Sequence, residues 1–109
     1  MITKYGTEID NQIIINNIKR LINQTYKLLP NREEGIDWTV PLFTINEEIA
    51  GMGYLFNEEI GEDTLALLNK LEGLQILTEE KDFFNFRRTI FECLNLMNKI
   101  KEYVIRNNE

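Results

Sequence analysis

The sequence of 109 residues contains no histidine and only one cysteine, and each of these features excludes classes of protein. A chain with one cysteine forms no internal disulfide, which suits a reducing compartment. Zinc sites built from Cys and His are excluded, as are His-dependent catalytic triads and the Glu-x-x-His pairs of di-iron bundles. We therefore expect a protein that is not an enzyme, with no catalytic residue, no metal and no cofactor.

Proline, glycine and long apolar runs are also scarce. Two prolines and six glycines favour long helices over a turn-rich β fold. No apolar run approaches membrane-spanning length, and the first residues lack the apolar core of a signal peptide. The net charge of −6 repels phosphate, so nucleic acid is not an expected partner. These features predict a soluble cytoplasmic protein with no membrane partner and a single domain over residues 1–109.

The most regular pattern lies near the end of the chain, where apolar residues recur at alternating spacings of three and four. This is the a/d pattern of a helix with one buried seam. The single cysteine occupies a d position, and no histidine is present to activate its thiol. We interpret it as a small buried hydrophobe rather than a nucleophile. The seam consists of Phe83, Phe86, Ile90, Cys93, Met97, Ile100 and Val104.

The first helix is predicted over residues 8–29. Thr7 is a suitable N-cap, with Asp10 reaching back in a variant of the capping box. Apolar residues at helical spacing then continue to Pro30. Since the residue before a proline is pushed away from the α region, we expect the helix to stop there.

The second helix is predicted over residues 40–57, with Thr39 as its N-cap. Gly51 and Gly53 interrupt it, which predicts either a close approach by a neighbouring backbone or a kink. Residues 57–63 contain a glycine and several acidic residues, and we interpret them as a turn.

Two more helices follow, over residues 63–77 and 79–106, the last of them capped by Thr78. Four amphipathic helices with short connections are typical of an antiparallel up-down-up-down bundle. The sequence therefore predicts an all-α four-helix bundle.

Two groups of apolar residues are candidates for contact with a protein partner. Trp38, with Ile36 beside it, lies in the longest polar connection. Exposed, it would be a typical interface anchor; the alternative we favour is a lid on the open end of the bundle. Phe84, Phe91 and Ile105 share one heptad position outside the seam of the last helix. A four-helix core does not need them, so they could face a second copy or another protein.

Charged residues cluster along the chain without forming a recognised motif. The acidic clusters do not match an EF-hand, and we interpret them as solvated helix ends and turns. The alternatives are a carboxylate metal site or an imitation of a phosphate backbone. The basic pairs are not part of a nucleic-acid-binding motif, and we interpret them as surface residues that form salt bridges. The acidic clusters begin at Glu33, Glu47, Glu58 and Glu79, and the basic pairs are Lys19-Arg20 and Arg87-Arg88.

Three stretches resemble small uncharacterised helical proteins carried by phages and integrative mobile elements of Gram-positive bacteria. The resemblance carries no known activity or site, and implies an accessory protein that acts by binding. The stretches are Asn-Arg-Glu-Glu-Gly at 31–35 followed by Asp37 and Trp38, Lys-Leu-Glu-Gly-Leu at 70–74, and Arg-Arg-Thr-Ile-Phe-Glu-Cys-Leu at 87–94.

Three functional hypotheses follow. The first is an acidic protein that binds and occludes a host or defence protein, with its carboxylates complementing a basic partner surface. The second is a binding chaperone or adaptor that holds an amphipathic helix in an apolar groove. The third is a carboxylate-based metal protein. The expected partner is another protein, or a second copy that forms a homodimer through the last helix.

Overall fold

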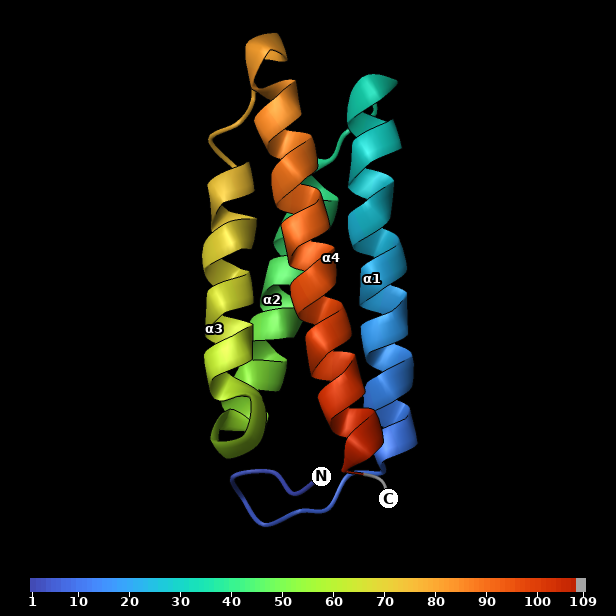
Figure 1. Ribbon diagram of the computed structural model, residues 1–109, viewed down its shortest axis with the longest axis vertical. Coiled ribbons are helices and arrows are strands. Elements are labelled where there is room, and N and C mark those ends of the chain that lie inside the picture. The colour runs from blue at the N-terminus through green and yellow to red at the C-terminus, as the bar shows by residue number, and fades with distance from the viewer. Residues whose placement is uncertain (108–109) are drawn as a thin grey trace.

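The computed structural model describes residues 1–107 and consists of four long helices and one 3-10 turn (Figure 1). The predicted all-α fold is confirmed. The β-type pairing within the described residues is a single bridge between Ile2 and Glu8. The helices are α1 (Asn11–Glu33), α2 (Thr39–Leu55), α3 (Asn57–Leu74) and α4 (Phe83–Arg106), and the 3-10 turn η1 covers Glu80–Asp82.

The helices form the predicted antiparallel bundle, and chain direction alternates from each helix to the next (Figure 1). Helix α1 packs against α2 and α4, and α3 packs against the same two helices. The contact between α1 and α2 is the least extensive of the four. The bundle is 45 Å long and 19 Å across in both other directions.

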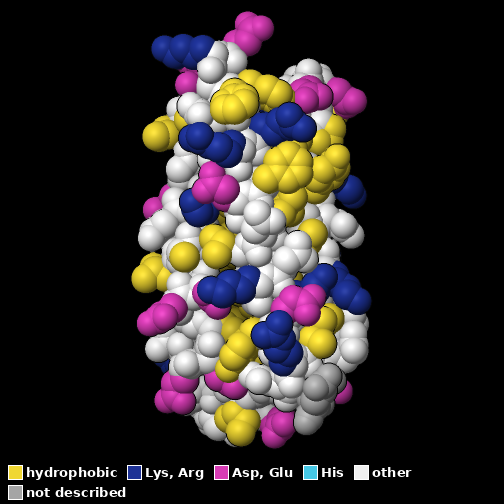
Figure 2. All heavy atoms as spheres, in the orientation of Figure 1, with side chains coloured by type: hydrophobic (Ala, Val, Ile, Leu, Met, Phe, Trp, Pro, Cys, Tyr) yellow, Lys and Arg dark blue, Asp and Glu magenta, His cyan; other side chains and the backbone are white. Residues whose placement is uncertain are grey.

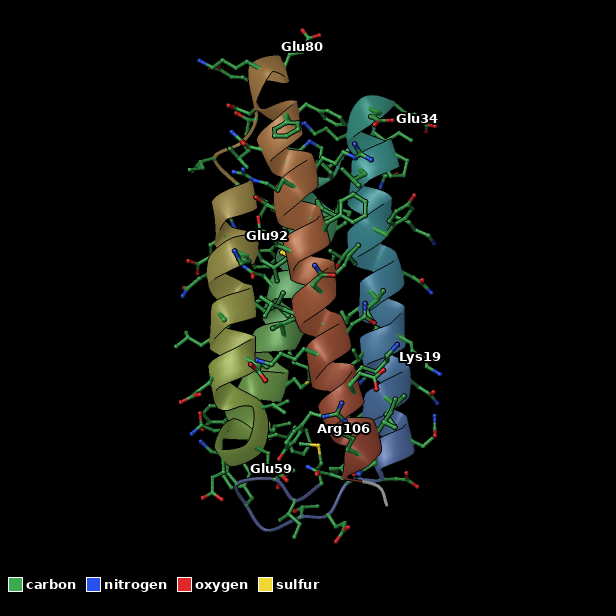
Figure 3. All side chains as sticks on the ribbon, in the orientation of Figure 1. Lys19, Glu34, Glu59, Glu80, Glu92 and Arg106 are labelled. Atoms are coloured by element: carbon green, nitrogen blue, oxygen red, sulfur yellow. The ribbon has the colours of Figure 1, made fainter. Side chains whose placement is uncertain are left out.

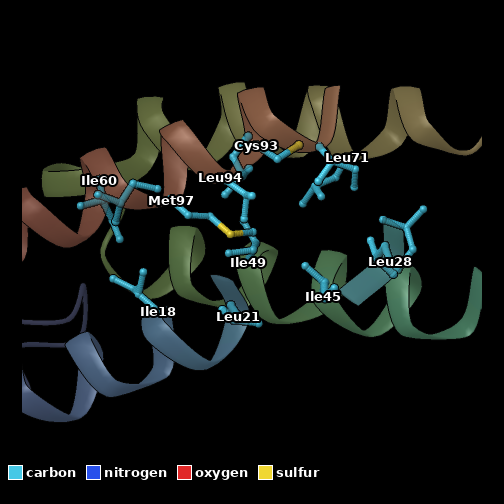
Figure 4. Packing of buried hydrophobic residues seen from close by; sticks show 14 of the residues in the cluster. Ile18, Leu21, Leu28, Ile45, Ile49, Ile60, Leu71, Cys93, Leu94 and Met97 are labelled. Carbon is cyan, nitrogen blue, oxygen red and sulfur yellow. The ribbon is translucent and has the colours of Figure 1, made fainter. Parts of the chain in front are cut away.

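The core contains buried apolar residues from all four helices (Figure 4). Helix α4 contributes the predicted seam, of which every residue after the half-buried Phe83 is buried. Full burial of one large apolar side chain contributes about 1.5–3 kcal/mol before chain entropy is subtracted. The seam pattern therefore located the buried side of α4 correctly.

The first helix begins later than predicted, at Asn11. Its N-cap is Asp10, whose carboxylate accepts from the backbone N–H of Gln12 at 2.7 Å. Thr7 instead belongs to a turn ahead of the helix, where its N–H donates to the Thr3 hydroxyl and its carbonyl accepts from the Thr3 N–H. Gly6, at φ +81°, allows the tight turn that this pairing requires.

Pro30 does not end α1, which continues to Glu33. A proline in the last turn of a helix removes one hydrogen bond, and the carbonyl of Pro30 still accepts from the N–H of Glu34 at 3.0 Å. The Arg32 guanidinium ties this last turn to the connection between α3 and α4 by donating to the carbonyls of Leu77 and Glu79. Tertiary hydrogen bonds thus stabilise the helical turn after Pro30, where the proline alone predicted the end of the helix.

The predicted turn at residues 57–63 is wrong, because these residues form the start of α3. The connection between α2 and α3 is a single residue, Phe56, whose side chain is buried. Its carbonyl accepts from the N–H groups of Glu59 and Ile60. Ile60 is also buried, so the apolar 3–4 spacing runs straight through the acidic stretch. Glu58 and Glu59 in the first turn favour a helix N-terminus electrostatically.

The caps of α2 and of the last helix also differ from the prediction. Helix α2 begins at Thr39 itself, and the Asp37 carboxylate accepts from the Thr39 hydroxyl at 2.7 Å and from its N–H at 3.0 Å. These hydrogen bonds lower the pKa of Asp37. Helix α3 ends at Leu74, and Glu79 and Asp82, not Thr78, form a reciprocal capping box ahead of α4.

Candidate protein-binding surfaces

Trp38 closes one end of the bundle. Its half-buried ring packs edge-on against the buried Phe86, with ring centroids 5.0 Å apart. The Arg32 guanidinium lies 4.3 Å from the centre of the Phe86 ring and 5.5 Å from that of Trp38. Burial lowers the pKa of Arg32, and the nearby Asp82 opposes this shift. The geometry matches the lid interpretation of Trp38, whereas Ile36 beside it is exposed.

The apolar residues outside the α4 seam divide into exposed and packed ones. Phe84 is 73% exposed and Phe91 is 41% exposed, whereas Ile105 packs against the core. Glu92 and Lys99 of α4 pair with α3, so the flank with the two phenylalanines turns towards α1. Figure 2 shows hydrophobic side chains gathered near the top of the view, over α1 and α4, with Lys and Arg side chains between them. We name Phe84 and Phe91 the α4 patch.

A second exposed apolar surface, not anticipated from the sequence, lies on the outer side of α2. Val40, Phe43 and Tyr54 are 64%, 61% and 57% exposed. Among the 17 residues of α2 only Glu47 and Glu48 are charged. A helix that is apolar on all sides is typical of a buried element. We name Val40, Phe43 and Tyr54 the α2 outer face; the signal for it was the run of apolar residues off the helix seam.

A groove of about 400 Å³ lies between α1 and α2. Arg20 of α1 and Glu48 of α2 form an ion pair at one end of the groove. Between this pair and the opposite end its surface is mostly apolar. We name it the α1–α2 groove. It is lined by Ile9, Ile13, Ile14, Asn17, Arg20, Leu21, Glu48, Gly51, Met52, Leu55 and Phe56.

The first residues of the chain fasten the opposite end of α2. The N–H of Lys4 donates to the carbonyl of Leu55 at 2.8 Å, and the Lys4 ammonium lies 3.2 Å from the centre of the Tyr54 ring. The hydroxyls of Tyr5 and Tyr54 are 3.1 Å apart. These contacts, with Lys4 as the largest cause, lower the pKa of Tyr54. Lys4 is therefore engaged with an aromatic ring of α2.

The acidic residues are not distributed evenly over the bundle. Residues 33–69, which include α2 and the first two-thirds of α3, contain nine Asp and Glu residues and no Lys or Arg. Across the α3–α4 contact, Lys70 pairs with Glu92 and Lys99 pairs with Asp63. Charged side chains point outward from the bundle, as Figure 3 shows for Lys19 and Glu59. The stretch of residues 33–69 is thus acidic in sequence, and two of its carboxylates, Glu48 and Asp63, pair with Arg20 and Lys99 of other helices.

Carboxylates also line a wide cavity of about 1070 Å³ between the first residues of the chain and the corner at Phe56. They belong to Glu8, Asp10, Glu58 and Glu59. Within residues 1–107, no group of three or more His, Cys, Asp or Glu side chains is arranged to hold a metal ion.

Cys93 is fully buried in the α4 seam, and burial raises the pKa of its thiol to about 12. Because the thiolate is the reactive form, we expect the folded protein not to react with a disulfide reagent such as Ellman's reagent. Labelling should stay negligible from about pH 7 to about pH 9, because a thiol of pKa about 12 remains almost fully protonated over this range, whereas a free cysteine of pKa near 8.5 is largely ionised at pH 9. In denaturant the same chain should react with one equivalent. Rapid labelling of the folded protein would contradict this placement.

Comparisons with protein-family models, with curated proteins and with solved structures gave no match to the chain. None of the helices in the described part of the chain is long and apolar enough to cross a membrane.

Proposed function

We propose that this protein is not an enzyme and acts by binding another protein through the α2 side of the bundle. The observation that supports this most strongly is the α2 outer face, because several large apolar side chains exposed along one side of a helix are typical of an interaction surface. Val40, Phe43 and Tyr54 belong to a helix with only two charged residues. A partner seated there would bury side chains that now contact water.

The charge of this side favours a basic partner surface. Seven of the nine carboxylates of residues 33–69 form no ion pair among residues 1–107, while Glu48 and Asp63 pair with Arg20 and Lys99 of other helices. Complementary charge speeds association and selects against acidic partners. In this proposal the protein inhibits or modulates its partner by occluding the surface that it covers. The proposed setting is the cytoplasm, where a single buried thiol stays reduced.

Self-association through the last helix is the second proposed mode of binding. The α4 patch exposes Phe84 and Phe91, which lie two turns apart on the same side of α4. A second copy seated on this patch would make a homodimer that leaves the α2 side free. Light scattering of the full chain separates the two modes, since a dimer through α4 should become a monomer in a Phe84→Ser, Phe91→Ser variant.

The proposed function is tested by affinity capture from the native host with three forms of the full chain. These are the unchanged protein, a Phe43→Ser, Tyr54→Ser variant, and a control Leu65→Ser, Ile76→Ser variant that changes exposed apolar residues elsewhere. We expect a partner that the unchanged protein and the control retain and the α2 variant loses. If every form retains the same proteins, or none retains any, the proposal is wrong.

A further inference from the structure

We propose that Tyr54 is a modification site, at which the phenol oxygen is the nucleophile toward neutral electrophiles of the sulfonyl fluoride class. This inference goes beyond the proposed function, because it concerns the chemistry of one side chain and needs no protein partner. Tyr54 lies near the end of α2 and is 57% exposed, so a small electrophile reaches its oxygen directly. Contacts with the first residues of the chain distinguish it from the other tyrosines.

The first residues fold back across the end of the bundle and bring a cation and a second phenol to Tyr54 (Figure 1). The N–H of Lys4 donates to the carbonyl of Leu55, which follows Tyr54 directly in α2. This backbone hydrogen bond fixes Lys4 and Tyr5 beside the Tyr54 ring. The Lys4 ammonium lies 3.2 Å from the centre of that ring and 5.4 Å from the centre of the Tyr5 ring. The hydroxyl oxygens of Tyr5 and Tyr54 are 3.1 Å apart.

Both contacts stabilise the phenolate form of Tyr54. A phenolate shares its negative charge between the oxygen and the ring, so an ammonium over the ring attracts it, and the Tyr5 hydroxyl donates to the oxygen. Hydrogen bonding by Lys4 is the largest cause that lowers the pKa of Tyr54, followed by hydrogen bonding by Tyr5 and by the charge of Lys4. Glu58 and Glu59 line the cavity that also contains Lys4, but Tyr54 is not part of that lining. The ammonium is therefore the charge that Tyr54 meets most closely.

The other tyrosines lack this arrangement. Tyr26 is 53% exposed, nearly as much as Tyr54, but among residues 1–107 it forms no cation–π contact and its hydroxyl forms no hydrogen bond. Tyr103 is half-buried, and its hydroxyl donates to the Glu59 carboxylate at 3.5 Å. Tyr26 is therefore an internal reference that matches Tyr54 in exposure and lacks the cation.

The reaction with a sulfonyl fluoride is a substitution at sulfur. The Tyr54 oxygen forms the new O–S bond, the S–F bond breaks, and fluoride leaves with the bonding electron pair. The phenol proton goes to the buffer, and nothing is oxidised or reduced. Lys4 stays an ammonium throughout and is a positioning residue, because it acts through the phenolate that it stabilises. The product is a sulfonate ester, which adds a fixed mass to one peptide of the protein.

The probe for this site is benzenesulfonyl fluoride, a neutral reagent, applied to the folded full chain. The experiment is run at about pH 8, where an ordinary tyrosine of pKa about 10 is only about 1% ionised. Peptide mass spectrometry locates the label and gives a rate for each tyrosine. We expect Tyr54 to be labelled at least about fivefold faster than Tyr26, the effect of one unit charge about 4 Å away in water. In urea the two rates should converge, because the contact with Lys4 is lost.

Three outcomes of this experiment would overturn the proposal. The first is labelling of Tyr54 and Tyr26 at equal rates in the folded protein. The second is faster labelling of Tyr5 or Lys4 than of Tyr54, which would place the nucleophile elsewhere. The third is a difference between Tyr54 and Tyr26 that persists in urea, because local sequence rather than the fold would then be its cause.

Two substitutions of Lys4 separate its charge from its structural role. Lys4→Gln removes the ammonium and keeps the backbone N–H that donates to Leu55, so it should bring the rate of Tyr54 close to that of Tyr26. Lys4→Arg keeps a positive charge and should retain most of the difference. Circular dichroism would check that both variants stay folded. Unchanged labelling of Tyr54 in a folded Lys4→Gln protein would contradict the proposal.

Two further variants complete the set. Tyr5→Phe removes only the second hydroxyl and should slow the labelling of Tyr54 in part, leaving the effect of Lys4 in place. Lys27→Gln is the matched control, because it removes an exposed lysine that follows Tyr26 directly in α1. It should change the rates of neither Tyr26 nor Tyr54. An equal loss of Tyr54 labelling in Lys27→Gln and Lys4→Gln would mean that net charge alone sets the rate, and the proposal would be wrong.

Discussion

The variant Ile90→Asp is expected not to fold. Ile90 lies at the centre of the α4 seam with 0% of its surface exposed, and its neighbours in the core are apolar. A carboxylate placed there is either ionised without a partner or protonated and without hydrogen bonds, and each form costs several kcal/mol. A domain of this size has a free energy of unfolding of only about 5–15 kcal/mol. The helical far-UV circular dichroism signal of the unchanged protein should therefore be lost or greatly reduced.

The matched control is Asn95→Asp, which adds the same charge on the exposed side of α4. Its thermal midpoint should stay close to that of the unchanged protein, since surface substitutions usually change stability by less than about 0.5 kcal/mol. Ile90→Val removes one methylene and should lower the free energy of unfolding by about 0.5–1.5 kcal/mol. A cooperative unfolding transition of Ile90→Asp near that of Asn95→Asp would place Ile90 outside the core.

The two glycines of α2 are expected to respond to alanine in opposite directions. At Gly53 an added Cβ would lie 2.3 Å from Oγ1 and 2.9 Å from Cβ of Thr64 on α3, so α2 and α3 would have to separate. Overpacking of this kind costs about 1–3 kcal/mol. At Gly51 the Cβ meets nothing within 4 Å, and alanine should stabilise the helix by about 0.5–1 kcal/mol. Urea unfolding of Gly53→Ala and Gly51→Ala measures both changes.

Thr64 cannot easily yield to the new methyl group. Its hydroxyl donates to the carbonyls of Ile60 and Gly61, each at 3.0 Å, and its side chain is buried. Removing the hydroxyl and methyl in a Gly53→Ala, Thr64→Ala double variant should therefore recover part of the loss, and the cycle should show coupling of more than about 0.5 kcal/mol. If Gly53→Ala were as stabilising as Gly51→Ala, the close contact of α2 with α3 would be refuted.

The contact at Gly53 was predicted from the sequence only in part. Two glycines in one helix predicted a close neighbour or a kink, and the neighbour is the side chain of Thr64 rather than a backbone. Gly51, in contrast, faces open space beside the α1–α2 groove. The sequence could not distinguish the two glycines, because the difference depends on which helix lies opposite.

The misplaced helix ends have the same kind of cause. Local rules ended α1 at Pro30, but the hydrogen bonds of Arg32 to the α3–α4 connection keep one more turn helical. The local composition of residues 57–63 predicted a turn. These residues are helical instead, because Phe56 and Ile60 are buried in the core. In both places contacts between distant segments outweighed a local preference of about 1–3 kcal/mol.

The candidate surfaces were predicted in part. The heptad count singled out Phe84 and Phe91, which are exposed, but also Ile105, which packs against the core. It missed the exposed Phe43 and Tyr54, because only the seam residues of α2 were considered and the apolar residues outside the seam were not.

The sequence by itself determined the helical class, the number of helices and the buried seam of α4, because the 3–4 spacing of apolar residues fixes which side of a helix leaves water. It also determined that Cys93 lies in that seam. Only the tertiary structure decided where the helices end, which neighbour each flank meets and where apolar surface stays open. The physical reason is that these features depend on contacts between residues far apart in the chain, such as Gly53 with Thr64 and Arg32 with Leu77.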